Sequence, residues 1–249
     1  MAAEANGVVT QLTRYPVKSM AGECLEEAEL VSTGLYGDRL CALIDETKES
    51  WERYVTARQV PELLAFRAAV ADDGRPGRGT LPAVRIEGPD GRLYEWDEAL
   101  LHEVQRYAKP KLSLYACDPD SELLAVDSAP ILIVAEQMLE RLALLVGKEA
   151  GFLRFRPNIV VRFPDGLFGN EQELVGKQLR IGDAVVRIVD SCERCSMITI
   201  DPETLERNPV LLKTVHREMN LRFGLYASVL QAGKIKLGDK VNVEYSLDR

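Results

Sequence analysis

The sequence predicts an α+β fold that is mainly β and is divided into two domains, residues 1–120 and residues 121–249. Short strand-like runs recur along the whole chain, and turn-forming residues separate them. Amphipathic helix patterns are few and short. A group of turn-forming and acidic residues at 119–122 is typical of a linker. We therefore expect the first domain to be a small β-barrel or a bent sheet.

The strands of the first half are predicted from runs of aliphatic, aromatic and β-branched residues. These runs lie at residues 8–17, 25–32, 40–45, 84–86, 93–96 and 112–118. A Pro-Asp-Gly turn at 89–91 predicts that the fourth and fifth runs form a hairpin. Asp97 can cap a following helix, in which Leu100 and Val104 share one face and which ends before Pro110.

The second half repeats this strand-rich pattern and adds two helices. Its strands are predicted at residues 130–134, 159–163, 179–181, 185–189 and 197–200. Residues 136–146 have an amphipathic helical pattern that stops at Gly147. Asn208 followed by Pro209 predicts the start of a helix that reaches about Met219.

Composition limits the classes of function. The chain has 39 acidic and 31 basic residues and a formal net charge of −8, whereas a general nucleic-acid-binding protein carries a basic surface. No apolar run approaches the roughly 20 residues that a membrane-spanning helix needs. Residues 1–7 lack the basic and apolar regions of a signal peptide. We therefore expect a cytoplasmic protein that does not bind nucleic acid as a general ligand and has no membrane partner.

Cys192 and Cys195 form a Cys-x-x-Cys pair between strand-like runs at 184–189 and 197–201. Such a pair is a set of metal ligands, a redox pair or a coincidence. A structural zinc site needs four ligands, and the chain offers no second Cys or His pair at ligand spacing. A thioredoxin-type pair begins a helix, whereas a strand is predicted after this pair. A single thiolate that binds a soft transition metal stays open, as does a redox role.

The other three cysteines stand alone in the sequence. The total of five is odd and unevenly spaced, so no disulfide framework is predicted. We expect Cys24, Cys41 and Cys117 to be small buried hydrophobic residues.

Cationic and amide side chains stand next to predicted strands at three places. These are Tyr-Pro-Val-Lys-Ser at 15–19, Gly-Leu-Tyr-Gly-Asp-Arg at 34–39 and Arg-Phe-Arg-Pro-Asn-Ile at 154–159. Side chains of these types bind phosphate and other anions. On a chain with a negative net charge, their recurrence predicts an anionic ligand at one end of the sheets.

Taken in their order along the chain, these motifs resemble the MOSC superfamily. The resemblance is carried by the segments at 15–19, 37–39, 154–160, 192–195, 201–202, 223–226 and 233–239. More narrowly, the chain is similar to the two-domain branch that includes the mitochondrial amidoxime-reducing component and its bacterial relatives. This resemblance implies an N-terminal β-barrel-like domain packed against a C-terminal MOSC β-barrel with peripheral helices. It also implies a molybdenum cofactor, Mo-molybdopterin, between the two domains.

The resemblance also implies roles for individual residues. In that family the second cysteine of the pair ligates molybdenum, so Cys195 would be the metal ligand and the catalytic residue. The residues implied to bind the pterin or its phosphate are Lys18, Ser19 and Arg39 from the first domain, and Asp127, Ser128, Arg156 and Asn158 from the second. Two features depart from the family pattern, namely Glu193 at a position that is usually small and the absence of glycine at 203–206.

Two functions of different kinds follow from the resemblance. The first is a molybdenum-dependent oxidoreductase that reduces small N-hydroxylated compounds with electrons from a separate electron-transfer protein, since no cluster or flavin motif is visible. The alternative is a carrier of molybdenum cofactor or of sulfur, with a persulfide on Cys195 that Cys192 resolves. A third reading is a MOSC-like protein that binds a different anion. The superfamily is also associated with pyridoxal phosphate binding.

Overall fold

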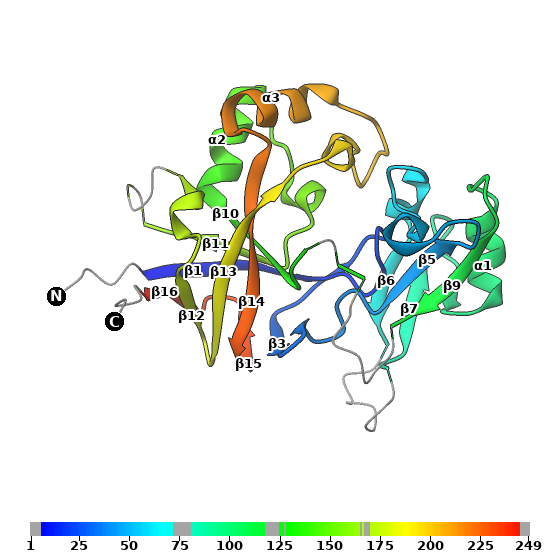
Figure 1. The fold of residues 1–249 in the computed structure, drawn as a ribbon, viewed down its shortest axis with the longest axis horizontal. Coiled ribbons are helices and arrows are strands. Elements are labelled where there is room, and N and C mark those ends of the chain that lie inside the picture. Colours follow the sequence, from blue (N-terminus) through cyan, green and yellow to red (C-terminus); the bar gives the residue numbers. More distant parts are fainter. Residues whose placement is uncertain are drawn as a thin grey trace.

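The computed structural model describes residues 6–71, 81–117, 125–126, 128–164, 166 and 170–244 (Figure 1). The strands within these ranges are β1 (Asn6–Arg14), β2 (Glu23–Cys24), β3 (Glu27–Val31), β4 (Gly34–Leu35), β5 (Cys41–Asp45), β6 (Arg67–Val70), β7 (Val84–Glu87), β8 (Leu93–Glu95), β9 (Leu112–Ala116), β10 (Ile131–Ala135), β11 (Ile159–Arg162), β12 (Gln178–Ile181), β13 (Ala184–Glu193), β14 (Arg222–Gln231), β15 (Gly233–Lys236) and β16 (Lys240–Glu244). The α-helices are α1 (Glu98–Gln105), α2 (Glu136–Val146) and α3 (Pro209–Met219). Single turns of 3₁₀ helix are η1 (Ser50–Arg53), η2 (Pro61–Ala65), η3 (Phe152–Phe155), η4 (Glu171–Leu174) and η5 (Ser196–Thr199).

Seven strands close into a β-barrel. Their order is β1, β11, β10, β14, β13, β12 and β16, and β16 pairs with β1 to complete the ring. All neighbours are antiparallel except β10 and β11, which are parallel. Strand β1 is fixed in register on both sides, because Leu12 pairs with Ile159 of β11 and Gly7 pairs with Val241 of β16. Closure satisfies backbone groups that an open sheet would leave at its edges.

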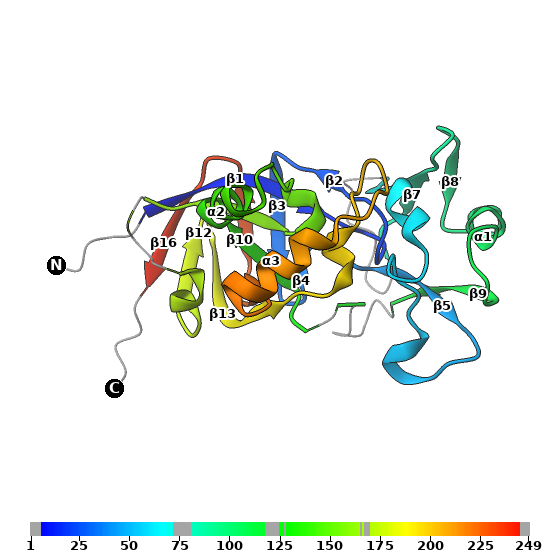
Figure 2. The ribbon, with the colours of Figure 1, turned by 90° about the horizontal axis from the view of Figure 1, so that it is seen from above.

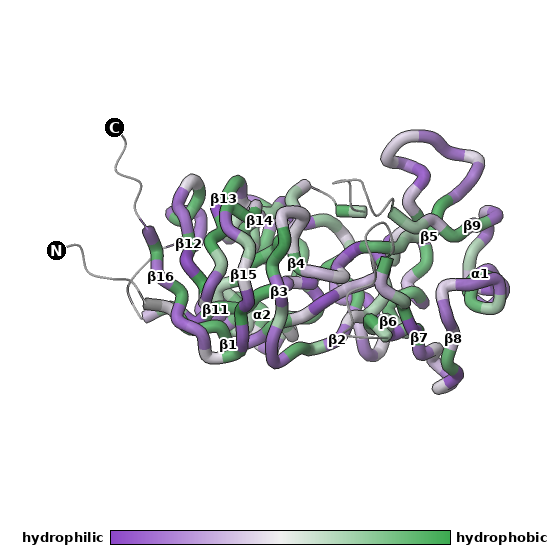
Figure 3. The backbone as a smooth tube through the Cα atoms, turned by 90° about the horizontal axis from the view of Figure 1, so that it is seen from below, coloured by the Kyte–Doolittle hydropathy of each residue, from purple (hydrophilic) through white to green (hydrophobic). Residues whose placement is uncertain are grey.

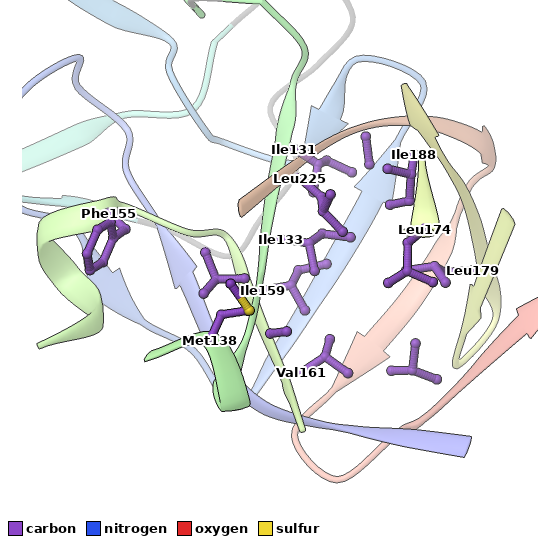
Figure 4. Close-up of a cluster of buried hydrophobic side chains, with 14 of the residues drawn as sticks. Ile131, Ile133, Met138, Phe155, Ile159, Val161, Leu174, Leu179, Ile188 and Leu225 are labelled. Carbon is purple, nitrogen blue, oxygen red and sulfur yellow. The ribbon is translucent and has the colours of Figure 1, made fainter. Parts of the chain in front are cut away.

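Apolar side chains fill the barrel. Ile133 of β10, Ile188 of β13 and Leu225 of β14 are among the buried residues drawn in Figure 4. Strand β16 shows the alternation that produces such an interior, since Val241 and Val243 are buried while the residues between and beside them are more exposed. This period of two places one face of β16 in the core, whereas β10 is buried on both faces. Figure 3, coloured by hydropathy, shows hydrophobic and hydrophilic residues interspersed along the barrel strands.

Strand β1 belongs to the barrel although it lies in the first predicted domain. Val9 and Leu12 of β1 and Leu30 of β3 share the barrel core, and β3 pairs with β15. Val17 is buried in a second core, the chain returns to the barrel core from Ala28 to Leu35, and from Leu40 it enters the second core again. The predicted division between residues 120 and 121 falls within 118–124, outside the described residues, and stays a prediction. In space, the first strands of the chain are part of the barrel.

The second core is smaller and lies beside the barrel (Figures 1 and 2). It is built from the pair β5–β9, the sheet β6–β7–β8 and helix α1. The predicted hairpin is confirmed as β7 and β8. Helix α1 begins as predicted, because the Asp97 carboxylate accepts hydrogen bonds from the backbone N–H groups of Ala99 and Leu100. Leu100 and Val104 are its buried residues.

Helices α2 and α3 contact each other and cover one end of the barrel (top of Figure 1). Both have the bounds that the sequence predicts. Gly147 ends α2 in the left-handed conformation, with φ of 77°. The Asn208 side chain accepts a hydrogen bond from the N–H of Val210 at 3.1 Å and caps α3, with Pro209 in its first turn.

One predicted strand is wrong. Residues 197–200 lie mainly in the 3₁₀ turn η5, which starts at Ser196. Ile198 and Thr199 are buried, and η5 packs against α3. The β-branched composition favours a strand, but the packing of this turn under α3 overrides that preference.

The predicted α+β, mainly β fold is confirmed by the barrel and its peripheral helices. None of the helices in the described ranges combines the length and the apolar character that crossing a membrane requires.

The place of β1 in the barrel gives a stability prediction. Replacing Leu12 by Ala removes a side chain that is almost fully buried in the barrel core. We expect the free energy of unfolding to fall by about 2–5 kcal/mol, and amide protons of β11 and β16 to exchange faster with solvent. Chemical denaturation and hydrogen exchange measure the two effects. Val17→Ala is the matched control, because Val17 lies in the smaller core. If the amide protons of β16 exchanged faster in Val17→Ala but not in Leu12→Ala, the assignment of β1 to the barrel core would be contradicted.

Candidate functional site

A cavity of about 280 Å³ lies where the barrel meets the smaller core. Its lining comes from two parts of the chain that are distant in sequence, residues between 18 and 58 and residues between 125 and 226. The first part leads out of β1 and around the smaller core, and the second comes from the barrel and its η turns. The cavity therefore exists only when both parts are folded together.

The cavity lining is strongly cationic. Its basic residues are Lys18, Arg39, Arg58, Arg154, Arg156 and Arg194. Among the described lining residues, Glu193 is the single carboxylate. The whole chain has a net charge of −8, so this excess of cations is local. A concave surface lined by one sign of charge concentrates ions of the opposite sign, and the cavity is therefore suited to an anion.

Tyr15 is the platform for two of these arginines. The guanidinium carbons of Arg39 and Arg156 lie 4.5 Å and 4.2 Å from the centroid of its buried ring. The Asp38 carboxylate accepts a hydrogen bond from the backbone N–H of Tyr15 at 2.6 Å and forms an ion pair with Arg39. Burial raises the pKa of Tyr15 to about 12, so its ring stays neutral. A neutral ring face holds guanidinium groups without cancelling their charge.

Lys18 is held in a similar way. Its Nζ donates a hydrogen bond to the carbonyl of Ala125 at 3.0 Å and lies 5.0 Å from the ring centroid of Trp51. Trp51 is about half exposed and lines the same cavity. The ammonium group of Lys18 thus links the first part of the lining to the second through its hydrogen bond to Ala125.

Three residues of the lining have a left-handed backbone. The φ angles of Ser19, Arg39 and Arg156 are 67°, 54° and 55°. This conformation is unfavourable for residues other than glycine, by on the order of 1 kcal/mol each. Contacts of the surrounding chain compensate; for example, the Arg156 guanidinium donates a hydrogen bond to the carbonyl of Met20 at 2.6 Å. Residues held in this way are frequent at functional sites.

The two cysteines lie at the end of β13 and differ in exposure. The strand extends through Glu193, so Cys192 is part of it and is buried. Cys195 follows the strand at the start of η5 and is exposed. Both residues line the cavity. The pair is therefore unequal, and the thiol of Cys195 is the accessible one.

Arg194, between them, is buried. Its guanidinium donates hydrogen bonds to the carbonyls of Phe223 at 2.7 Å and Phe155 at 3.0 Å. Nη2 of Arg194 and Nη1 of Arg154 are covered, and each has no hydrogen-bond acceptor among the described residues. Arg154 forms an ion pair with Asp201, whereas the acceptors of Arg194 are neutral carbonyls. The charge of Arg194 therefore contributes to the positive potential of the cavity.

Asn158 has a role that the sequence did not indicate. Its side-chain Oδ1 accepts a hydrogen bond from the N–H of Leu132 at 3.0 Å, and its Nδ2 donates to the carbonyl of Thr13 at 3.2 Å. Its backbone also bonds to the same two residues. Asn158 thus joins β1 and β10 behind the cavity, and its amide is engaged by the fold.

The structure brings most of the predicted site residues to one place. Those that line the cavity are Lys18, Ser19, Arg39, Arg156, Asn158 and Cys195. Ser128 is exposed and is not part of the lining. Asp127 lies outside the described residues. Among the lone cysteines, Cys41 and Cys117 are buried as expected, but Cys24 is exposed, because it lies on the two-residue strand β2 that pairs with the end of β1.

Comparison with known proteins identifies the family. The MOSC N-terminal beta barrel domain matches residues 6–88, and the MOSC domain matches residues 120–242. Mitochondrial amidoxime reducing component 2 of Macaca fascicularis is 30% identical, over 94% of this chain and 83% of that protein. The chain belongs to the MOSC family. The resemblance drawn from the sequence motifs is confirmed.

Two further relatives extend the comparison of this MOSC protein. Molybdenum cofactor sulfurase of Caenorhabditis elegans is 25% identical over 88% of the chain, which spans 33% of that longer protein. Among solved structures, the YUAD protein from Bacillus subtilis superposes with a TM-score of 0.52 at 13% identity, over 99% of this chain and 100% of that one. The last similarity concerns the fold alone.

Several residues that line or support the MOSC cavity were absent from the predicted site. Tyr15 and Asp38 flank the predicted Lys18 and Arg39 in sequence, but their function as platform and anchor depends on contacts in space. Trp51 lies in η1 and was missed, because a lone aromatic residue in a loop has no motif. Arg194 lies between the two cysteines in sequence but was not among the predicted site residues, and its guanidinium lies beside the rings of Phe155 and Phe223.

A buried carboxyl group supports the wall of the MOSC cavity behind Arg194. Glu171 accepts hydrogen bonds from the backbone N–H groups of Ala135 and Gly224. Burial raises its pKa to about 7, while these bonds and the charge of Arg194 act in the opposite direction. Gly224 has a φ of 84°, and a Cβ there would lie 2.8 Å from Nη2 of Arg194. Glycine therefore allows β14 to pass close to the buried arginine.

The raised pKa of Glu171 predicts how stability depends on pH. In the unfolded chain Glu171 ionises near its ordinary pKa of 4.5, whereas in the folded protein it ionises only near pH 7. Between these two pH values the folded protein therefore keeps a proton on Glu171 that the unfolded chain has lost. The stabilisation is complete below about pH 4 and is lost as the pH rises to 7 and above. We expect the stability of wild type relative to Glu171→Gln to fall by about 2–3 kcal/mol between pH 5 and pH 8. Denaturant titrations at both pH values measure it. Glu173→Gln is the control, because Glu173 is an exposed neighbour in the same turn. If the difference in free energy of unfolding between wild type and Glu171→Gln did not change with pH, the prediction would be contradicted.

Proposed function

We propose that this chain binds the molybdenum cofactor in the MOSC cavity and reduces N-hydroxylated compounds with electrons from a separate protein. The observation that carries the proposal is the concentration of cations around one exposed thiol, Cys195, in a protein that is otherwise acidic. Relatives named as amidoxime-reducing components and as a molybdenum cofactor sulfurase support a function related to this cofactor.

The residues of the cavity fit the chemistry of the cofactor. Its pterin carries a dianionic phosphate, which guanidinium and ammonium groups bind well. Lys18, Arg39 and Arg156 would hold the phosphate or the pterin, and the buried Arg194 would add to the attraction. The guanidinium groups of Arg39 and Arg156 are already held against the ring of Tyr15. Binding therefore costs little additional side-chain conformational entropy.

Cys195 fits the role of the metal ligand. A thiolate is a soft ligand, suited to a metal that a dithiolene already holds. Within the described ranges, no three His, Cys, Asp or Glu side chains gather as a metal-binding group. Cys195 would thus be the protein's contribution, and the cofactor would bring the remaining sulfur ligands. When bound, the cofactor supplies the two-electron chemistry that side chains lack.

The chain's own part in the reaction is binding and orientation. Reduction of an N–OH group takes two electrons and two protons and yields an N–H group and water. Trp51, half exposed at the cavity, offers an apolar face on which a planar substrate can lie. The five cysteines do not have the Cys-x₄-Cys-x₂-Cys spacing of a plant-type ferredoxin. The electrons therefore come from outside these 249 residues.

Replacement of Cys195 by Ala tests this function. We expect reduction of an amidoxime such as benzamidoxime, with a chemical or protein electron donor, to fall by at least about 100-fold, since even residues that only orient a metal ligand contribute 10–100-fold. Cys192→Ala is the matched control and should keep most of the activity, because Cys192 is buried. Molybdenum content and the fluorescence of the oxidised pterin are measured on the same samples.

Full turnover by Cys195→Ala would overturn the assignment. So would the absence of molybdenum and pterin from protein made in a host that synthesises the cofactor.

A second function is favoured by the unequal exposure of the two cysteines. An exposed Cys195 could carry a persulfide, with Cys192 close in sequence as the resolving thiol, and one relative is named a molybdenum cofactor sulfurase. Alkylation and mass spectrometry of the purified protein distinguish the two functions. A persulfide on Cys195 without bound molybdenum supports sulfur transfer, whereas bound molybdenum with an unmodified thiol supports reduction.

A further inference from the structure

The carboxylate of Glu193 differs from every other charged group that lines the cavity. The remaining charged lining residues in the described ranges are six cations. Glu193 is the last residue of β13 and lies two residues before Cys195. A negative group so close to the accessible thiol must affect which molecules approach it.

The alternation of β13 places Glu193 on the accessible side. Cys192 and Arg194 are buried, whereas Glu193 and Cys195 are exposed. The Glu193 side chain is 65% exposed and still lines the cavity. Its carboxylate is therefore at the rim, where a molecule that reaches Cys195 would meet it.

The Glu193 carboxylate keeps its capacity to bind a ligand. Its one ion-pair partner in the described part of the chain is Arg222, whose Nη2 lies 3.8 Å away, beyond hydrogen-bonding distance. Arg222 instead donates a hydrogen bond to the carbonyl of Ser191 at 3.0 Å. Both oxygens of Glu193 thus remain available as acceptors.

A planar cation matches such a carboxylate. Guanidinium and amidinium groups donate two parallel N–H bonds to the two oxygens of one carboxylate, and the opposite charges strengthen both bonds. A positively charged substrate would otherwise be repelled by the basic lining. Neutral N-hydroxylated molecules gain nothing from the charge of Glu193.

We propose that Glu193 selects positively charged N-hydroxylated substrates, of the N-hydroxyguanidine class, over neutral ones of the same shape. This inference rests on the proposed function of the cavity and adds its substrate class. Glu193 acts here as a substrate-binding residue at the rim and takes no part in the redox step.

Binding of a charged and a neutral molecule of the same shape tests the proposal. Phenylguanidinium and phenylurea are such a pair and correspond to reaction products. We expect the wild-type protein, as purified, to bind phenylguanidinium about threefold to fivefold more tightly, as is typical of a partly exposed ion pair. Glu193→Gln should reduce this ratio to one or below, because the basic lining then repels the cation. The ratio should also shrink at high salt. Ligand-observed NMR titration gives both dissociation constants without turnover.

Asp190→Asn is the matched control. Asp190 is an equally exposed carboxylate on the same strand and also lies near Arg222, but it is not part of the cavity lining. The ratio should stay unchanged in this variant. A parallel change is expected in turnover, where the ratio of kcat/KM for N-hydroxy-N′-phenylguanidine and N-hydroxy-N′-phenylurea should fall threefold to fivefold in Glu193→Gln.

The outcomes separate this inference from the function on which it rests. Equal affinities of the wild type for the two ligands, or a ratio that Glu193→Gln leaves unchanged, would overturn the selection by Glu193. Molybdenum content is measured on the same samples, and its absence would overturn the proposed function, while the binding ratio still decides the role of Glu193.

Discussion

Holding several cations close together around one cavity is the physical constraint on which this structure depends. Carboxylates would fix arginines firmly, but they would also cancel the charge that attracts an anion. The acceptors of Arg194 are the carbonyls of Phe223 and Phe155. Lys18 and Arg156 also donate to carbonyls, and aromatic rings lie beside all three cations. Arg39 and Arg154, by contrast, form ion pairs with carboxylates. Backbone carbonyls and ring faces orient a cation while leaving its full charge in the cavity. The left-handed backbone at Ser19, Arg39 and Arg156 is a cost of bringing these groups together.

The same arrangement explains why the cavity needs both parts of the chain. Lys18 reaches the carbonyl of Ala125, and Arg156 reaches that of Met20. Each cation is thus fixed by an acceptor from the opposite part. Asn158 ties β1 to β10 immediately behind them. The walls are therefore defined before any ligand arrives, which reduces the entropy that binding must offset.

Local chemistry explains which elements could be predicted from the sequence. Asp97, Gly147 and Asn208 mark helix ends through contacts within a few residues, and the structure has those ends as predicted. The strand predicted at 197–200 failed because burial under α3 decides the conformation there. The structure gathers at the cavity most of the site residues that the sequence motifs predicted. The motifs did not indicate that the amide of Asn158 joins two strands, or that Trp51 lines the cavity. The amide of Asn158 joins residues that lie 26 and 145 positions away in sequence, and Trp51 lies in a short turn that has no periodic signal.

Closure of the barrel by β1 has a consequence for how the protein can be made. Residues 6–14 are synthesised well before their partners in β11 and β16, which lie near residues 160 and 242. Contacts so distant in sequence form slowly, because a long loop must close before they contribute. Residues 121–249 produced alone would have a barrel with an open seam, whose exposed edges invite pairing with other chains. The two halves therefore need each other to fold. A protein made from only the MOSC domain of this chain would need another strand in the place of β1 to close the barrel.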